Sequence, residues 1–170
     1  MGGDRAYVAT FTSFYIIDGH TGQPTFLDVG AVAHEVAISG DGRVLYAGKT
    51  VKSIAIAPNG RLVYVAHDPD DWAFRIDASA NVLDGKIPLT RGPLSVIDTS
   101  VDKVTATIDV YDPAAIAFTA DSAYAYVTNA SSDRVSVIDT KQKTVTQTIR
   151  VGSEPRGIAI GVVPDTSGAP

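Results

Sequence analysis

The chain has 170 residues, of which 45% are hydrophobic and 19% are charged, and its formal net charge is -5. This is the composition of a folded globular domain, and an acidic chain without a run of basic residues is not suited to binding nucleic acid. The chain has no cysteine, which excludes disulfide bonds, thiolate metal sites and a cysteine nucleophile.

Short runs rich in valine, isoleucine, threonine and tyrosine follow one another along the chain. Each run is bounded by Gly, Asp, Asn, Pro or Ser, and branching at Cβ favours a pleated strand over a helix. No window keeps a helical period, so the sequence predicts an all-β chain. The sixteen predicted strands are, in chain order, residues 6–10, 14–18, 24–29, 34–39, 44–48, 51–57, 62–67, 73–77, 82–89, 94–98, 103–110, 114–119, 123–129, 135–139, 144–151 and 156–161.

The runs fall into four types that recur in order. Type a is a short apolar run such as "AAIAFT" (114–119), and type b is centred on Tyr-Val, as in "AYAYVTN" (123–129). Type c ends in Ile-Asp, as in "VSVID" (135–139), and type d is rich in Thr and Val, as in "TVTQTIRV" (144–151). Since the connections are short and carry turn residues, the order a-b-c-d predicts a four-stranded antiparallel meander, or blade.

Two residue types recur at fixed places in this repeat. The type b tyrosines are Tyr7, Tyr46, Tyr64 and Tyr126, and the type c aspartates are Asp18, Asp77, Asp98 and Asp139. Recurrence at one structural position predicts a packing role for the tyrosines. We expect the aspartate carboxylates to accept hydrogen bonds from backbone N–H groups in the turns that follow.

The spacing of the tyrosines is irregular in the middle of the chain. Successive tyrosines are 39, 18 and 62 residues apart, and the last two spacings together make two repeats of about 40 residues, the length of a propeller blade. Either a whole repeat at about 51–89 is nested inside another, or one repeat has lost two strands and the next carries an insertion at 68–92. In both cases we expect a single domain, 1–170, with an irregular or inserted repeat at about 51–92.

The two ends of the chain complement each other. The chain begins with a b-c-d set of strands and ends with a lone type a strand at 156–161. Each end alone would expose unpaired backbone groups. We therefore expect the C-terminal strand to pair with the N-terminal strands and close a ring, either within one chain or in a dimeric eight-bladed ring.

The stretch "AYVTN…VSVIDT…VTQTIRVGSEPRGIAI" closely resembles the YVTN-type β-propeller repeat, named for the residues that stand here from Tyr126 to Asn129. The resemblance is strong over roughly 93–163, fair over 5–67 and poor over 68–92. It implies a β-propeller, usually with about seven blades, whereas this chain has about four blades' worth of strands. Four blades can close a ring, two chains can form one eight-bladed ring, or the chain can be part of a larger one. Related propellers include lactonases, so the fold does not fix the activity.

The same resemblance implies a location. The family is mostly seen in extracytoplasmic and surface-layer proteins, so we expect a secreted, periplasmic or cell-surface protein. The N-terminal stretch "MGGDRAYV" lacks the basic and apolar regions of a signal peptide, so we expect either a cytoplasmic protein or a mature or trimmed chain from which the signal peptide is absent. No apolar run approaches the roughly 18 residues of a membrane span, so we expect no membrane insertion.

In a propeller, the b-to-c and d-to-a loops share one face, and loops on a rigid scaffold often carry function. The candidate binding residues on these loops are His34, His67, Asp68, Asp70, Asp71, Trp72 and Arg156. Other interpretations of the same residues are a solvated acidic loop at 68–71, a tryptophan that packs the insertion onto the body, and, for Arg156, an ion pair with Glu154 or a contact between blades.

These residues support three hypotheses. The first is a non-enzymatic module without a cofactor that binds a protein or a cell-surface polymer through this loop face. The second is a metal-assisted hydrolase of the lactonase type, with calcium or zinc held at the channel mouth by His34, Glu35, His67 and Asp68. The third is a structural subunit that closes its ring only as a homodimer. No nucleophile motif is present, so the sequence leaves open whether the chain is an enzyme.

Overall fold

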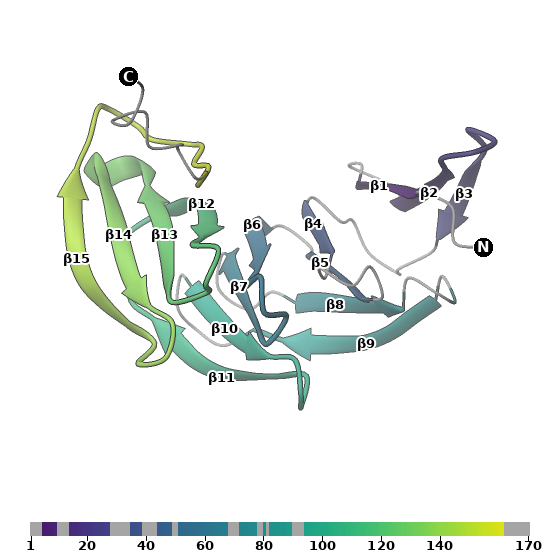
Figure 1. The fold of residues 1–170 in the computed structure, drawn as a ribbon, viewed down its shortest axis with the longest axis horizontal. Coiled ribbons are helices and arrows are strands. Elements are labelled where there is room, and N and C mark those ends of the chain that lie inside the picture. The colour runs from purple at the N-terminus through teal and green to yellow at the C-terminus, as the bar shows by residue number, and fades with distance from the viewer. Residues whose placement is uncertain are drawn as a thin grey trace, which may run out of the picture.

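The computed structural model describes residues 5–9, 14–27, 35–38, 44–48, 51–67, 72–77, 80, 82–89 and 94–161. Within these residues the chain forms fifteen strands and one short 3-10 turn, and the strands gather into four antiparallel sheets (Figure 1). The described part has no α-helix, so the expectation of an all-β chain built from blade-like sheets is confirmed.

The first and fourth sheets follow the chain in simple meanders. The first sheet contains β1 (Arg5–Ala9), β2 (Phe14–Asp18) and β3 (Pro24–Leu27). The fourth contains β12 (Pro113–Phe118), β13 (Tyr124–Asn129), β14 (Arg134–Asp139) and β15 (Thr144–Arg150). The 3-10 turn η1 (Ala130–Ser132) connects β13 to β14.

The second and third sheets are interleaved along the chain. The second sheet has the order β4 (Glu35–Ile38), β5 (Val44–Gly48), β8 (Trp72–Asp77) and β9 (Val82–Pro88). The third has the order β6 (Val51–Ile56), β7 (Leu62–His67), β10 (Leu94–Asp98) and β11 (Lys103–Ile108). In both sheets, the inner two strands are therefore separated in sequence from the outer two by a pair of strands that belongs to the other sheet.

This pairing corrects both interpretations of the irregular spacing. The nested repeat is wrong, because β7 pairs with β10 and not with β8. The other interpretation is right that the segment 68–92 separates β7 from β10 in sequence. It is wrong that the preceding repeat has lost two strands, because this segment holds the hairpin β8–β9, which pairs with β5 and supplies the outer strands of the second sheet.

The repeat is visible in the register of the three four-stranded sheets. In each of them an alanine of the innermost strand stands opposite the type b tyrosine of the next strand. These pairs are Ala37 with Tyr46, Ala55 with Tyr64, and Ala117 with Tyr126. The next strand outward then places Arg75, Val96 and Val137, respectively, opposite the same tyrosines.

Arg75 gives a physical reason for the interleaving. Opposite Tyr46, its guanidinium forms an ion pair with Asp84 and lies 3.2 Å from a carboxylate oxygen of Asp102. A nested repeat would place Arg75 opposite Tyr64, where the neighbouring residues form an apolar cluster with the fourth sheet. Because burying an unpaired charge is costly, the valine of β10 is the better occupant of that position.

The cores lie between successive sheets, which stand side by side in an arc (Figure 1). One cluster joins the second and third sheets: Tyr46, Val51, Ile54, Val63, Val65, Ala73, Ile87, Leu89 and Ile97. Another joins the third and fourth sheets: Tyr64, Ala66, Leu94, Val96, Ile108, Val110, Ile116, Ala125, Val127 and Ile138. The innermost strands are neighbours, with β6 packed beside both β4 and β12.

The type c aspartates hold the turns after their strands, as expected from the sequence. Asp98 accepts from the Ser100 N–H at 2.9 Å, and Asp139 accepts from the Lys141 N–H at 2.9 Å. Asp18 accepts from the N–H groups of His20 and Thr21, and Asp77 from that of Ala80. The hydrogen bonds from Ser100 lower the pKa of Asp98, because they stabilise its charged form.

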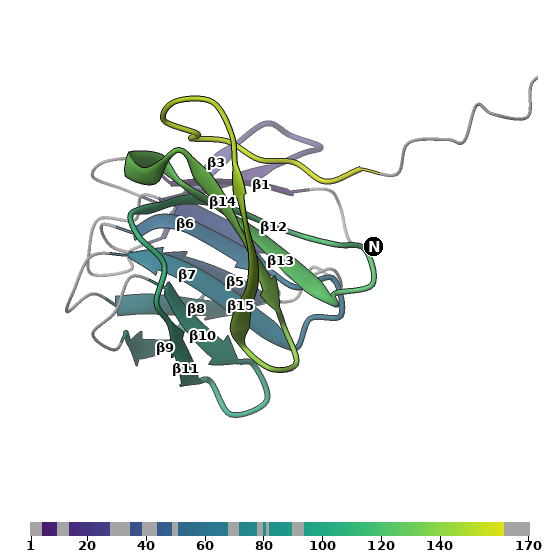
Figure 2. The ribbon, with the colours of Figure 1, turned by 90° about the vertical axis from the view of Figure 1, so that its left-hand side faces the viewer.

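The two ends of the arc are not joined in this structure. The first sheet has three strands, and residues 156–161 belong to none of the four sheets. The first sheet and β15 lie at opposite ends of the arc (Figure 1), and the segment after β15 leaves above the fourth sheet (Figure 2). The predicted closure of a ring is therefore not confirmed. No helix in the described part of the chain is long and apolar enough to cross a membrane.

Candidate functional site

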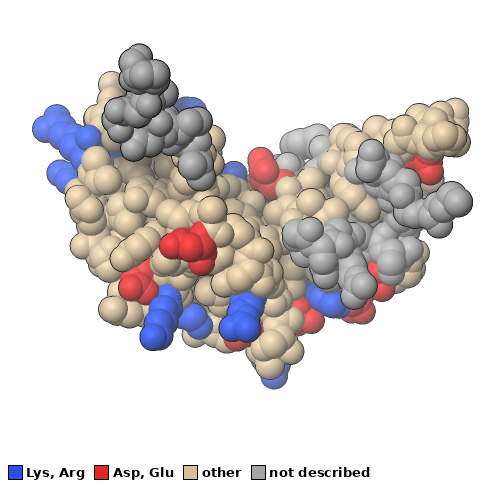
Figure 3. Space-filling model, viewed as in Figure 1, with Lys and Arg blue, Asp and Glu red and all other residues tan. Residues whose placement is uncertain are grey.

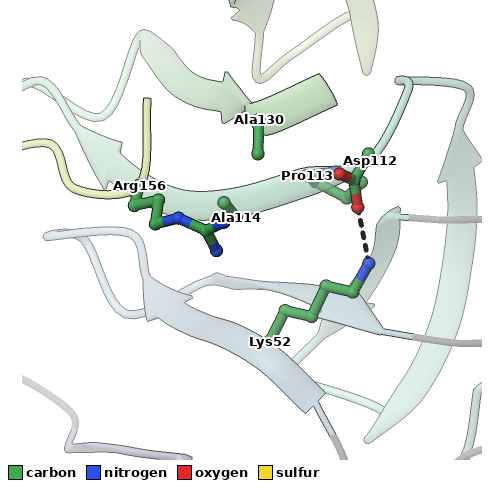
Figure 4. Close-up of a pocket in the computed structure, with 6 residues that line it drawn as sticks. All are labelled: Lys52, Asp112, Pro113, Ala114, Ala130 and Arg156. Carbon is green, nitrogen blue, oxygen red and sulfur yellow. Dashed lines mark hydrogen bonds and ion pairs between the residues drawn. The ribbon is translucent and has the colours of Figure 1, made fainter. Parts of the chain in front are cut away.

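A pocket of about 410 Å³ opens where the third and fourth sheets meet the segment after β15 (Figure 4). Its lining residues come from the start of β6, the start of β12, the turn η1 and the C-terminal segment. They are Lys52, Asp112, Pro113, Ala114, Ala130 and Arg156. The pocket therefore combines two cationic side chains with one carboxylate.

Asp112 stands in the connection from β11 to β12, where it has a left-handed backbone (φ 49°) that aspartate tolerates. Its carbonyl accepts the Ala130 N–H at 3.0 Å, which ties this connection to η1. Its carboxylate receives Lys52 Nζ at 2.7 Å on one oxygen and the Ser131 hydroxyl on the other. These hydrogen bonds, that from Lys52 foremost, lower the pKa of Asp112, so the carboxylate is charged at neutral pH.

Arg156 reaches the same pocket from a turn that Asp133 holds. The Val151 N–H donates to the Asp133 carbonyl at 2.9 Å, and the Glu154 N–H donates to the Asp133 carboxylate at 3.0 Å. The Arg156 guanidinium lies 2.8 Å from Glu154, with three quarters of its side chain exposed. The ion pair that was an alternative for Arg156 is therefore present, yet the exposed pair remains open to a ligand because such pairs are weak.

The pocket brings together loops that the sequence placed on one face. Asp112 and Arg156 follow type d strands, whereas Ala130 and Ser131 follow the type b strand β13. Figure 3 shows lysine, arginine, aspartate and glutamate side chains scattered over the molecule, which is hollowed along its upper edge between the two ends of the arc. Charge of one sign does not dominate this view.

Lys52 was not among the residues singled out from the sequence. The register that aligns Ala55 with Ala117 also aligns Lys52 with Ala114. The same alignment of "RGIAI" with "KSIAI" puts Arg156 at this position. A charged residue at the start of an otherwise apolar inner strand is thus the sequence signal that identifies Lys52.

For most of the other predicted site residues, the structure does not describe the side chain. His34, Asp68, Asp70 and Asp71 lie outside the described residues. His67 ends β7 and Trp72 begins β8, but only their backbone is described, and Glu35 is an exposed residue at the start of β4. Within the described residues no cluster of three His, Cys, Asp or Glu side chains is suited to a metal ion. The proposed metal set of His34, Glu35, His67 and Asp68 therefore stays a prediction.

The sequence matches no protein-family model and no curated protein. Among solved structures, the chain described as Kuenenia stuttgartiensis hydrazine synthase is similar, with 13% identity, a TM-score of 0.52, and coverage of 89% of this chain and 72% of that chain. A functionally unknown protein from Desulfotomaculum acetoxidans DSM 771 has 11% identity and a TM-score of 0.48, over 90% and 68% of the two chains. The first likeness supports the β-rich fold alone, and the second carries no argument.

Proposed function

We propose that this chain is a non-enzymatic binding module that recognises another protein or a cell-surface polymer through its b-to-c and d-to-a loops. The observation that supports this proposal most is the pocket formed by Lys52, Asp112 and Arg156. Because Lys52 is anchored by Asp112 while Arg156 is largely exposed, Arg156 is the group best placed to pair with an anion on a partner.

We also propose the setting of this module. Its sheets belong to a closed propeller of the YVTN type in an extracytoplasmic protein. The common register of three sheets and the recurring tyrosines support the propeller repeat. The location rests on the resemblance of residues 93–163 to that family.

The binding proposal is tested with an acidic polymer. Calorimetric titration with a short oligogalacturonate should give binding, and a neutral dextran of similar length should give none. Replacing Arg156 with alanine should weaken binding about tenfold, the loss expected for one charge-assisted hydrogen bond. The matched control is Arg61→Ala, which removes an exposed arginine from an a-to-b turn at the other end of the strands.

Two results would contradict the proposal. Equal binding of the acidic and the neutral oligosaccharide would show that the pocket does not select an anion. Equal losses in the Arg156→Ala and Arg61→Ala variants would show that binding depends on general charge and not on this loop face.

A further inference from the structure

Each blade-like sheet has two faces, and successive sheets pack with unlike faces together. We call the face that carries the type b tyrosine the trailing face and the opposite face the leading face. On the third sheet, the trailing face carries Tyr64, Val96 and Ile108, and these residues pack against Val127 and Ile138 on the leading face of the fourth sheet. This contact defines what a sheet-to-sheet interface looks like in the chain.

The trailing face of the fourth sheet has apolar residues at the equivalent positions, but among the described residues no further sheet packs against it. Ile149 occupies the position of Ile108, yet it is 38% exposed whereas Ile108 is 4% exposed. Val151 and Val110 differ in the same way, at 38% and 5%. Tyr126 is only half-buried, whereas its counterpart Tyr64 is fully buried. Val135 and Val137 on the same face are buried, so the exposure is concentrated at Tyr126 and along the outer strand β15, which faces the viewer in Figure 2. This part of the fourth sheet thus presents an interface without a partner among the described residues.

The leading face of the first sheet is uncovered as well. Val8 occupies the position of Val127, and it is 37% exposed whereas Val127 is completely buried. Ala6 is exposed although its counterpart Ala125 is buried. Phe26, which contacts the ring of Tyr15 edge-on, is 57% exposed on this side. Contiguous apolar surface of this kind marks an interaction site.

The first sheet also lacks an innermost strand, and the C-terminal segment has the sequence of one. In the fourth sheet the innermost strand β12 pairs along β13, and β1 is the counterpart of β13. Residues 156–160, "RGIAI", align with the start of β6, but they belong to no described strand and Ile160 is 40% exposed. A segment of this kind can add to the free edge of a sheet through backbone hydrogen bonds.

We propose that two copies of this chain join head to tail, so that the C-terminal segment of each copy becomes the innermost strand of the other copy's first sheet. The trailing face of each fourth sheet then packs on the leading face of the other copy's first sheet. A second copy is favoured because the two surfaces are unlike and lie at opposite ends of the arc (Figure 1). Two copies related by a two-fold axis form this contact between unlike surfaces twice, and the assembly is then a closed ring. The ring has eight sheets, a number within the range of known propellers.

The proposal is tested by sedimentation velocity over a range of concentrations. The native chain should form a dimer of twice the 17.8 kDa chain mass. The variants Val8→Glu and Ile149→Lys each place a charge on one of the two surfaces, and each should weaken dimerisation about a hundredfold. The matched control is Val101→Lys, a change at a 55% exposed valine in the turn between β10 and β11, which should leave the dimer intact.

Mixing the two charged variants tests the head-to-tail arrangement itself. A mixed dimer has one unaltered interface and one in which the introduced glutamate faces the introduced lysine as an opposite charge. The mixture should therefore dimerise more tightly than either variant alone. If Ile149→Lys loses the strand signal in circular dichroism, Gln147→Lys on the same exposed strand replaces it.

Three results would overturn the proposal. The first is a native chain that stays monomeric at all concentrations. The second is a series of species larger than the dimer, which would mean that the contacts do not close. The third is a mixture that dimerises no more tightly than either variant alone, or one charged variant that dimerises normally, because two like surfaces would then form the contact. None of these outcomes depends on whether the pocket binds an anion.

Discussion

The recurring tyrosines show how one repeat position serves two kinds of contact. The Tyr46 hydroxyl donates to Asp102 at 2.9 Å and so links the second sheet to the turn between β10 and β11. The Tyr64 hydroxyl is buried without a hydrogen-bond partner among the described residues, and its ring instead packs edge-on against Phe118, with centroids 5.0 Å apart. Burial raises the pKa of both phenols, so both are neutral at physiological pH.

The two tyrosines therefore respond differently to loss of the hydroxyl. Tyr46→Phe should destabilise the chain by about 1 kcal/mol, because it removes the hydrogen bond from Tyr46 to Asp102 and leaves Asp102 with its ion pair to Arg75. Tyr64→Phe should be neutral or slightly stabilising, because it removes a polar atom that has no partner. Urea unfolding of the two variants measures the difference, and equal destabilisation would contradict this account of the two sites.

The carboxylate of Asp112 gives a prediction on pH. Its pKa is lowered in the folded chain, mainly by Lys52. Its contribution to stability is therefore complete above the unfolded pKa of about 4 and is lost as the pH falls through the lowered folded value. Lys52→Met should raise the pKa of Asp112 toward its ordinary value, as followed by NMR of the carboxyl carbon. The control Lys141→Met, in an exposed turn, should leave the pKa of Asp112 unchanged. If Lys52→Met also leaves it unchanged, Lys52 is not the main cause of the lowered pKa.

At the scale of elements, the sequence predicted the strands well but not all of their partners. The positions of β1 to β15 follow from runs of β-branched residues and from turn residues, which act locally. The choice of strand partners in the second and third sheets does not follow from such local patterns, because β8 and β10 both end in Ile-Asp and both suit a type b neighbour. What separates them is the position of Arg75 beside Asp84 and Asp102, which depends on residues distant in sequence.

The interleaved pairing is tested with cysteine pairs, which are unambiguous in a chain that has no other cysteine. Val44 and Asp77 are register partners in β5 and β8. Partners in antiparallel strands lie about 4.5–5.5 Å apart at Cα, which suits a disulfide. Val44→Cys with Asp77→Cys should therefore cross-link under oxidation. The control pair is Leu62→Cys with Asp77→Cys, which only a nested repeat would bring together, and it should not cross-link. Cross-linking of the control pair in place of the first pair would support the nested arrangement.

The candidate site was predicted only in part. The face formed by the b-to-c and d-to-a loops and the place of Arg156 on it follow from strand alternation, which the repeat makes readable. Lys52 was missed because it lies inside a strand, whereas strand alternation points only to residues in the loops. The binding role of His34, His67, Trp72 and the acidic residues between 68 and 71 stays a prediction.

At the scale of the whole molecule, the structure is an arc of four sheets with one uncovered face at each end. Burial between sheets is the main source of stability in such a stack, since each sheet covers the apolar face of its neighbour. The two end faces are where this pattern stops, and they carry the same residue types as the covered faces. The sequence pattern predicts that residues 156–161 are the innermost strand of a first sheet, but it does not tell a sheet of the same chain from one of another copy.

Amide hydrogen exchange at residues 157–160 tests this account most directly, because a strand that is added to a sheet protects its backbone N–H groups. Residues 157 and 159 correspond to Ser53 and Ala55, which occupy the hydrogen-bonded positions of β6. We predict that exchange at Gly157 and Ala159 slows as the protein concentration rises through the range in which dimers form, while exchange in β13 stays slow throughout. Exchange of these C-terminal amides at the rate of an unstructured peptide at every concentration would contradict the proposed completion of the first sheet.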